Sequence, residues 1–157
     1  MRRLLSNGLA MFAGVVSLPV AATNPPSPPC VYPRYQNDPR LARLREFFEQ
    51  RDCPAQQFSE AFLRASDTYS LDWRLLPSIS LVESGGGREA RNNNVLGWAN
   101  GRHAFASVDQ GIHQVASRLA QSKLYRDKNL EEVLETYNPG ANYPAVVKTV
   151  MQRIAPE

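Results

Sequence analysis

Glu83 stands at the end of an apolar stretch of helical period and is followed, after Ser84, by three consecutive glycines. A carboxylate on a buried helix face is disfavoured in its charged form because burial removes it from water. The negative end of the helix dipole disfavours the charge as well. Both effects favour the protonated carboxyl group that a general acid needs. The alternative interpretation is an ordinary helix-end glutamate whose side chain reaches solvent.

The helix that must position Glu83 is indicated by apolar residues at three- and four-residue spacing, namely Leu75, Leu76, Ile79 and Val82. Glu83 follows Leu76 and Ile79 at i+7 and i+4, so it continues the apolar face. Gly85–Gly87 supply the flexible backbone at which helices commonly end. Pro77 fits only the first turn of a helix, so the helix either begins near Leu75 or is kinked.

Two cysteines and two histidines offer little further chemistry. Cys30 and Cys53 are an even pair, and we expect a disulfide between them in an oxidising compartment, with two unpaired thiols as the alternative. His103 and His113 are ten residues apart and far from either cysteine, so we interpret both as structural or solvent-facing and expect no metal site and no cofactor. A Cys–His protease built on Cys53 stays open.

The segment Leu71–Ser84, with its Glu83-Ser84 pair, resembles the catalytic helix of the lysozyme-like lytic transglycosylases. The stretch that follows is similar to a sister family, the endo-β-N-acetylglucosaminidases of bacterial wall hydrolases. The matching segments are Glu83–Gly87, Asn93–Trp98 and Phe105–Val108.

A third element, Thr136–Gly140, resembles the Ala-Tyr-Asn-Ala-Gly element of the transglycosylases, from which Thr136 and Pro139 depart. Together the matches run in the family order from about Gln56 to Ile154.

The resemblance implies a lysozyme-like fold and a peptidoglycan glycosidase with Glu83 as its catalytic acid. The substrate-binding residues that it implies are Ser84, Asn94, Trp98, Tyr137 and Asn138. For Trp98, packing in the core is an equally strong interpretation. Candidates for a second carboxylate are Glu89 and Asp109, and we expect the former to be solvated and the latter to serve a helix N-terminus. Hydrolysis and intramolecular cyclisation both stay open.

The N-terminus predicts export. Met1–Ala22 has a basic start, an apolar middle and small residues before Thr23, which is typical of a secretory signal peptide; a retained membrane anchor is the weaker alternative. Residues 23–38 form a proline-rich arm, and 39–157 form the glycosidase domain. We therefore expect a periplasmic or extracellular bacterial protein without a stable membrane span, acting as a monomer on peptidoglycan glycan strands.

The charge balance argues against a nucleic-acid partner. The whole chain carries +3, but without Arg2 and Arg3 there are 16 basic residues against 15 acidic ones. No block of Lys and Arg with interleaved aromatic residues occurs in the sequence.

The helical periodicities predict a mainly α fold of five or six helices with a small loop or hairpin lobe at residues 91–105. We expect one helix to begin at Pro39, a second to run from about Gln57 to Tyr69, and a third to end near Glu83. A fourth begins after Ser107 in a capping-box pattern. The last two span Leu130–Tyr137 and Tyr143–Ile154. Two alternative functions use the same fold, a noncatalytic peptidoglycan-binding module and a protein-interaction domain or inhibitor.

Overall fold

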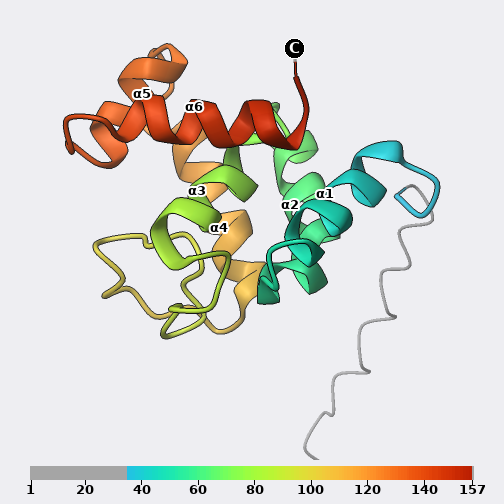
Figure 1. The fold of residues 1–157 in the computed structure, drawn as a ribbon. Helices are drawn as coiled ribbons and strands as arrows, with labels where there is room; N and C mark the ends of the chain where they lie inside the picture. Colours follow the sequence, from blue (N-terminus) through green and yellow to red (C-terminus); the bar gives the residue numbers. More distant parts are fainter. Residues whose placement is uncertain (1–34, 157) are drawn as a thin grey trace, which may run out of the picture. The chain divides into compact units, whose positions relative to one another are not determined.

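The computed structural model of the chain describes residues 35–156, and this part is built from helices and turns without a β-strand (Figure 1). In chain order its elements are α1 (Pro39–Glu49), the 3-10 helix η1 (Pro54–Phe58), α2 (Ser59–Thr68), α3 (Leu75–Ser84), α4 (Val108–Gln121), α5 (Leu130–Tyr137) and α6 (Tyr143–Ile154). The mainly α class is confirmed. The predicted signal peptide and most of the proline-rich arm lie outside the described residues.

The N-terminal helix α1 begins where the sequence predicts it. Asp38 is its N-cap and accepts a hydrogen bond from the backbone N–H of Arg40 at 2.9 Å. The buried face consists of Leu41, Leu44, Phe47 and Phe48. Tyr35, at the end of the predicted arm, is also buried at 3% exposure, so the packed core includes residues before position 39.

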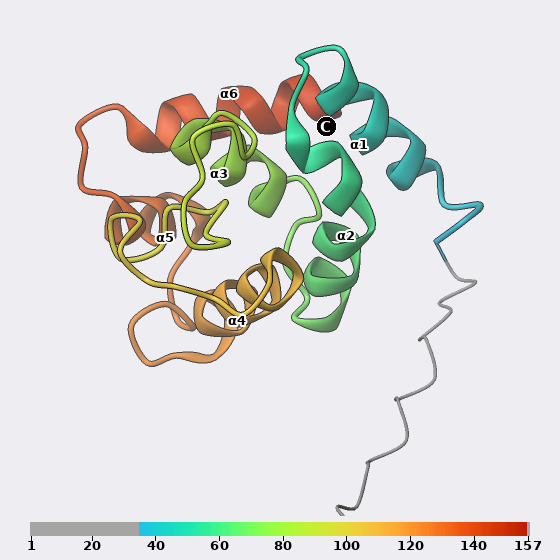
Figure 2. The same ribbon diagram turned by 90° about the horizontal axis from the view of Figure 1, so that it is seen from below.

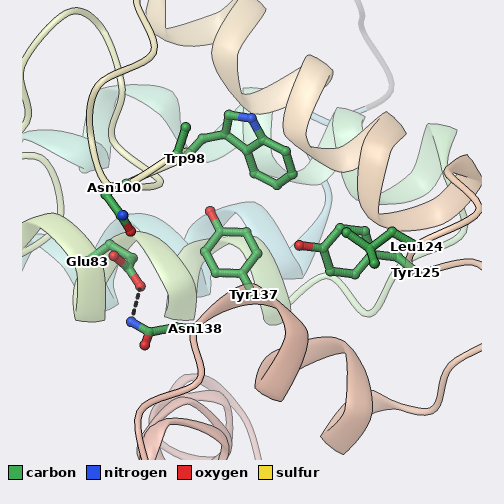
Figure 3. Close-up of a pocket in the computed structure, with 9 residues that line it drawn as sticks. Glu83, Trp98, Asn100, Leu124, Tyr125, Tyr137 and Asn138 are labelled. Carbon is green, nitrogen blue, oxygen red and sulfur yellow. Dashed lines mark hydrogen bonds between the residues drawn. The ribbon is translucent and has the colours of Figure 1, made fainter.

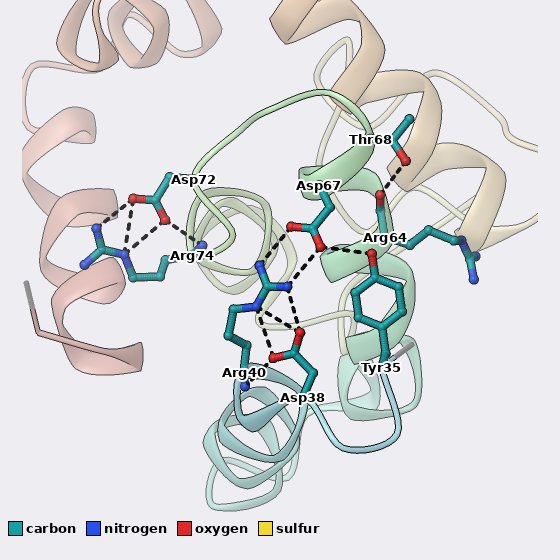
Figure 4. A network of polar contacts seen from close by, with 8 residues as sticks. All are labelled: Tyr35, Asp38, Arg40, Arg64, Asp67, Thr68, Asp72 and Arg74. Carbon is teal, nitrogen blue, oxygen red and sulfur yellow. Dashed lines mark hydrogen bonds and ion pairs between the residues drawn. The ribbon is translucent and has the colours of Figure 1, made fainter. Parts of the chain in front are cut away.

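Arg40 joins the start of α1 to α2 (Figure 4). Its guanidinium contacts the Asp38 carboxylate at 2.7 Å and the Asp67 carboxylate at 2.8 Å. The hydroxyl of Tyr35 donates a further hydrogen bond to Asp67 at 3.0 Å. The hydrogen bonds to Asp67 and Asp38 raise the pKa of Arg40 above its ordinary value.

Helix α3 lies in the interior, where it packs against α6 and α2 (Figures 1 and 2). Leu76 and Ile79 are fully buried, as the periodicity predicts, whereas Val82 is only partly buried. The helix begins at Leu75, so Pro77 lies in its first turn, where a missing N–H costs nothing. Gly85 ends the helix in the left-handed conformation, with φ +59°.

The N-termini of α4 and α5 differ in how well the sequence predicts their capping hydrogen bonds. Ser107 caps α4 by accepting a hydrogen bond from the N–H of Gln110 at 3.1 Å, but the Gln110 side chain bonds the N–H of Ala106 instead of closing a capping box. Asn129 and Glu132 form a complete capping box at the start of α5, which the sequence analysis missed. On α6, Val146 is exposed because only one face meets the core.

The expected lobe at residues 91–105 is an irregular loop of turns, and the hairpin alternative is wrong. Asn92 and Asn93 have φ values of 56° and 57°, the left-handed conformation that asparagine tolerates better than most residues. Across residues 35–156, no helix combines the length and the apolar character needed to cross a bilayer.

Candidate active site

A pocket of about 240 Å³ opens beside the end of α3 (Figure 3). Its lining comes from four separate stretches of the chain. The lining residues are Glu83, Gly97, Trp98, Ala99, Asn100, Leu124, Tyr125, Tyr137 and Asn138. Four of the predicted site residues, Glu83, Trp98, Tyr137 and Asn138, are thus brought together in one cavity.

Glu83 lies in the last turn of α3 and is half-buried. It is the only carboxylate among the described residues that line the pocket. The side-chain amide of Asn138 donates to its Oε1 atom at 3.4 Å, which is long for a hydrogen bond. The Tyr-Asn element therefore faces Glu83, as the resemblance implies.

The backbone of Gly97 passes directly over the Glu83 carboxyl group, with no room for a side chain between them. Gly97 has φ +67°, a left-handed conformation that glycine adopts without strain. Gly97 belongs to the motif Asn93–Trp98 but is not among the predicted site residues. Its position directly before Trp98, a predicted site residue, is the feature of the sequence that could have identified it.

One wall of the pocket is aromatic. The Trp98 ring lies 5.7 Å from that of Tyr137 and 6.3 Å from that of Tyr125, measured between ring centroids. The Arg118 guanidinium lies 5.6 Å from the Trp98 ring. Trp98 is half-exposed, so it packs on the core with one part and lines the cavity with another. Its packing on the core is thus observed, and its contact with a substrate stays a prediction.

Two tyrosines adjoin the Glu83 carboxylate. The Tyr137 hydroxyl donates to the carbonyl oxygen of Leu96 at 2.5 Å, which fixes the ring against the loop. Burial, and then the charge of Glu83, raise the pKa of Tyr137 well above its ordinary value. The same two causes raise the pKa of Tyr143. Both hydroxyls are therefore neutral donors throughout the physiological pH range.

Ser84 and Asn94, two of the expected substrate-binding residues, are not among the residues that line the pocket. The buried Ser84 hydroxyl donates to the carbonyl oxygen of Val95 at 2.6 Å and accepts from the N–H of Gly87 at 3.0 Å. The buried Asn94 amide donates to the carbonyl oxygens of Trp98 and His103. Both side chains hold the loop in place, and their neighbours in sequence face the cavity.

The pocket also contains residues that the sequence analysis did not single out. Asn100 lies beside Glu83, and Leu124 and Tyr125 complete the apolar wall (Figure 3). Leu124 is 57% exposed, so its side chain is open to a bound molecule. None of these residues belongs to a recognised motif, and only the folded chain brings them to Glu83.

The other candidate groups lie elsewhere. Glu89 is exposed, and Asp109 forms an ion pair with Arg64, so neither lines the pocket. His113 accepts a hydrogen bond from Arg64 at 3.2 Å, and His103 is exposed beside Phe105. Within residues 35–156, no group of three or more His, Cys, Asp or Glu residues is placed to hold a metal ion.

Cys53 is buried next to Gly86, one of the glycines that follow α3. A Cβ atom on Gly86 would lie 2.7 Å from the Cys53 sulfur, so the two residues pack tightly. Burial raises the pKa of the Cys53 thiol. Cys30 lies outside the described residues, and the disulfide between them stays a prediction.

No protein-family model matches the chain. No curated protein matches it significantly. Function is therefore inferred from the residues of the pocket and their geometry.

Proposed function

We propose that this protein is an exported bacterial glycosidase with a lysozyme-like fold that cleaves the β-1,4-linked glycan of peptidoglycan. The observation that carries the proposal is the position of Glu83, a single half-buried carboxyl group beside Asn138 in the described lining of a cavity with an aromatic wall. The motif resemblance supplies the substrate class.

The pocket has the two kinds of surface that a glycan needs. Trp98, Tyr125 and Leu124 offer apolar surface against which the faces of sugar rings can pack. Asn100 and Asn138 offer amide donors and acceptors for hydroxyl and acetamide groups. Such a mixture of apolar walls and a few polar groups is typical of small-molecule and oligosaccharide sites.

Glu83 acts first as the general acid. Its proton moves to the glycosidic oxygen as the bond between that oxygen and the anomeric carbon breaks, and the leaving sugar departs with a hydroxyl group. The anomeric carbon is left electron-deficient, and Glu83 is left as a carboxylate. The carboxylate then removes a proton from the incoming nucleophile, which closes the cycle.

The nucleophile decides between two products. Water gives a reducing end, and the 6-hydroxyl of the same sugar gives a 1,6-anhydro ring. Glycosidases with two carboxylates place them roughly 5 to 9.5 Å apart across the scissile bond. Because Glu83 has no carboxylate partner in the described lining, a single-residue mechanism assisted by the substrate acetamide is the one we favour.

The test is to incubate the mature protein with purified peptidoglycan and identify the released muropeptides by mass spectrometry. We expect release by the wild type, abolished release by Glu83→Gln, and normal release by Glu89→Gln, whose carboxylate is exposed and outside the pocket. Anhydro ends would identify a lytic transglycosylase, and reducing ends would identify a hydrolase.

Three outcomes would contradict the proposal. Undiminished release by Glu83→Gln would show that another group is the acid. Sacculus binding by both proteins without new chain ends would identify a noncatalytic wall-binding module. Absence of binding as well would favour a protein-interaction domain.

A further inference from the structure

Tyr143, the first residue of α6, has a buried hydroxyl group without a hydrogen-bond partner among the described residues. The residue is only 7% exposed. Buried polar groups are nearly always paired, because an unpaired one has lost its bonds to water, so each exception calls for an explanation. The other buried hydroxyls without a partner belong to serines outside the pocket lining, namely Ser66, Ser78, Ser80 and Ser122.

The position of this hydroxyl is fixed by packing. The Tyr143 ring stacks on that of Tyr137 at a centroid distance of 6.2 Å and an interplanar angle of 10°. Tyr137 is itself held by its hydrogen bond to the Leu96 carbonyl oxygen. Helix α6, which begins at Tyr143, packs along α3, which ends just after Glu83. Tyr143 is therefore a rigid donor beside the catalytic helix.

The charge of the Glu83 carboxylate affects the Tyr143 hydroxyl group. After burial, the Glu83 carboxylate is the largest cause of the raised pKa of Tyr143, so the phenol keeps its proton next to an anion. Glu83 also acts on this pKa as a hydrogen-bond acceptor, although the hydroxyl does not meet full hydrogen-bond geometry in this structure.

Few other groups can stabilise an ionised Glu83. The Asn138 amide is 3.4 Å from Oε1. The Tyr137 hydroxyl already donates its proton to the carbonyl oxygen of Leu96. Tyr125 adds a further neutral phenol to the lining. The described lining has no Lys, Arg or His, and Arg118 contacts the Trp98 ring.

We propose that Tyr143 is a positioning residue for Glu83, whose hydroxyl donates a hydrogen bond to the carboxylate that forms when Glu83 has given its proton to the leaving oxygen. The proposal rests on the proposed function. The tyrosine keeps its own proton throughout, and no covalent bond to it forms. A hydrogen bond to a carboxylate is stronger than one to a neutral carboxyl group, so the donor acts mainly as charge develops in the transition state.

The first test is Tyr143→Phe, which removes only the hydroxyl. Its melting temperature should equal or exceed that of the wild type, because the hydroxyl has no partner in the described fold. Its kcat on peptidoglycan should fall roughly 10- to 100-fold, the effect of one hydrogen bond to a charged group. The alkaline limb of its pH–activity profile should move to higher pH, because losing a donor to the carboxylate disfavours ionisation.

The matched control is Tyr137→Phe, which removes a hydroxyl that is already bonded. That variant should melt at a lower temperature than the wild type, because the Leu96 carbonyl oxygen loses its donor. A clear loss of melting temperature in Tyr143→Phe would overturn the proposal, since it would reveal a structural partner. An unchanged pH profile with kcat within twofold of wild type would overturn it too.

A second readout does not depend on activity. The carboxyl carbon of Glu83, labelled with ¹³C and assigned through Glu83→Gln, can be titrated by NMR in the wild type and in Tyr143→Phe. We expect its titration midpoint to move to higher pH in the variant, and coincident curves would contradict the proposal. If the wild type proved inactive on peptidoglycan, the proposed function would fail while this titration still tested the contact.

Discussion

Gly97 and Glu83 pack so closely that a Cβ atom on Gly97 would lie 2.5 Å from Oε2 of the glutamate and 2.9 Å from its Cβ. Gly97→Ala should therefore displace the carboxyl group from the position at which it meets the glycosidic oxygen. A displacement of about 1 Å lowers catalysis on the order of 100-fold, so we expect kcat/KM on peptidoglycan to fall by that factor. Muropeptide release over time measures it.

Gly101 provides the control for this variant. Its φ of +72° is close to that of Gly97, but nothing lies within 4 Å of the position of a Cβ atom. Gly101→Ala should carry a similar backbone strain of about 1 kcal/mol and leave activity near the wild-type value. Equal loss of activity in both variants would show that strain, and not the contact with Glu83, is responsible.

Trp98→Phe should weaken substrate binding more than it slows the chemical step. The smaller ring keeps part of the contact with Tyr137 but offers less surface to a sugar ring and to Arg118. We expect KM to rise about tenfold with little change in kcat, the pattern of an interaction present in both ground and transition states. Trp73→Phe, at a residue outside the pocket lining, should leave KM unchanged.

Ser84→Ala should affect stability and spare catalysis. The change leaves the Val95 carbonyl oxygen without its donor and the Gly87 N–H without this acceptor, which costs about 1 to 3 kcal/mol of unfolding free energy. Urea denaturation measures the loss, and activity at 25 °C should stay within about twofold of the wild type. The exposed hydroxyl of Ser117, bonded to Gln121, gives a control variant whose stability should change by less than about 0.5 kcal/mol.

The histidine on α4 predicts a pH dependence of stability. Burial, and then the charge of Arg64, lower the pKa of His113 from its ordinary 6.5, and Asp109 opposes the effect. The unfolded chain therefore binds more protons than the folded chain, so stability falls as the pH drops below about 6.5. His113→Gln should flatten this decline in urea midpoints between about pH 7 and 5. An equally steep decline in the variant would assign the effect to other groups.

Local signals account for most of what the sequence predicts correctly about the fold. The bounds of α5 and α6 are confirmed because their apolar periodicity and flanking residues lie within a few positions of each other. The helix expected from about Gln57 to Tyr69 is instead split into η1 and α2. Pro54 starts the tighter turn of η1, and periodicity alone does not distinguish that turn from an α-helix.

The site residues likewise divide into those that local motifs predict and those that only tertiary contacts bring to the pocket. Glu83, Trp98, Tyr137 and Asn138 are found from short motifs, and all of them line the pocket. Ser84 and Asn94 belong to the same motifs but bond to backbone carbonyl oxygens and do not line the pocket, because the direction of a side chain depends on the partners that the fold supplies. Asn100, Leu124 and Tyr125 carry no local signal, and tertiary contact alone brings them to the cavity.

The cavity walls are contributed by the last turn of α3, residues 97–100, residues 124–125 and the end of α5. A fragment that lacks any one of these stretches cannot form the cavity, and mixtures of fragments form it only if they reassemble. The proposed glycan cleavage therefore requires the native structure. On heating, loss of this activity should coincide with the loss of near-ultraviolet circular dichroism from the buried tyrosines and the partly buried tryptophans, ahead of any remaining helical signal.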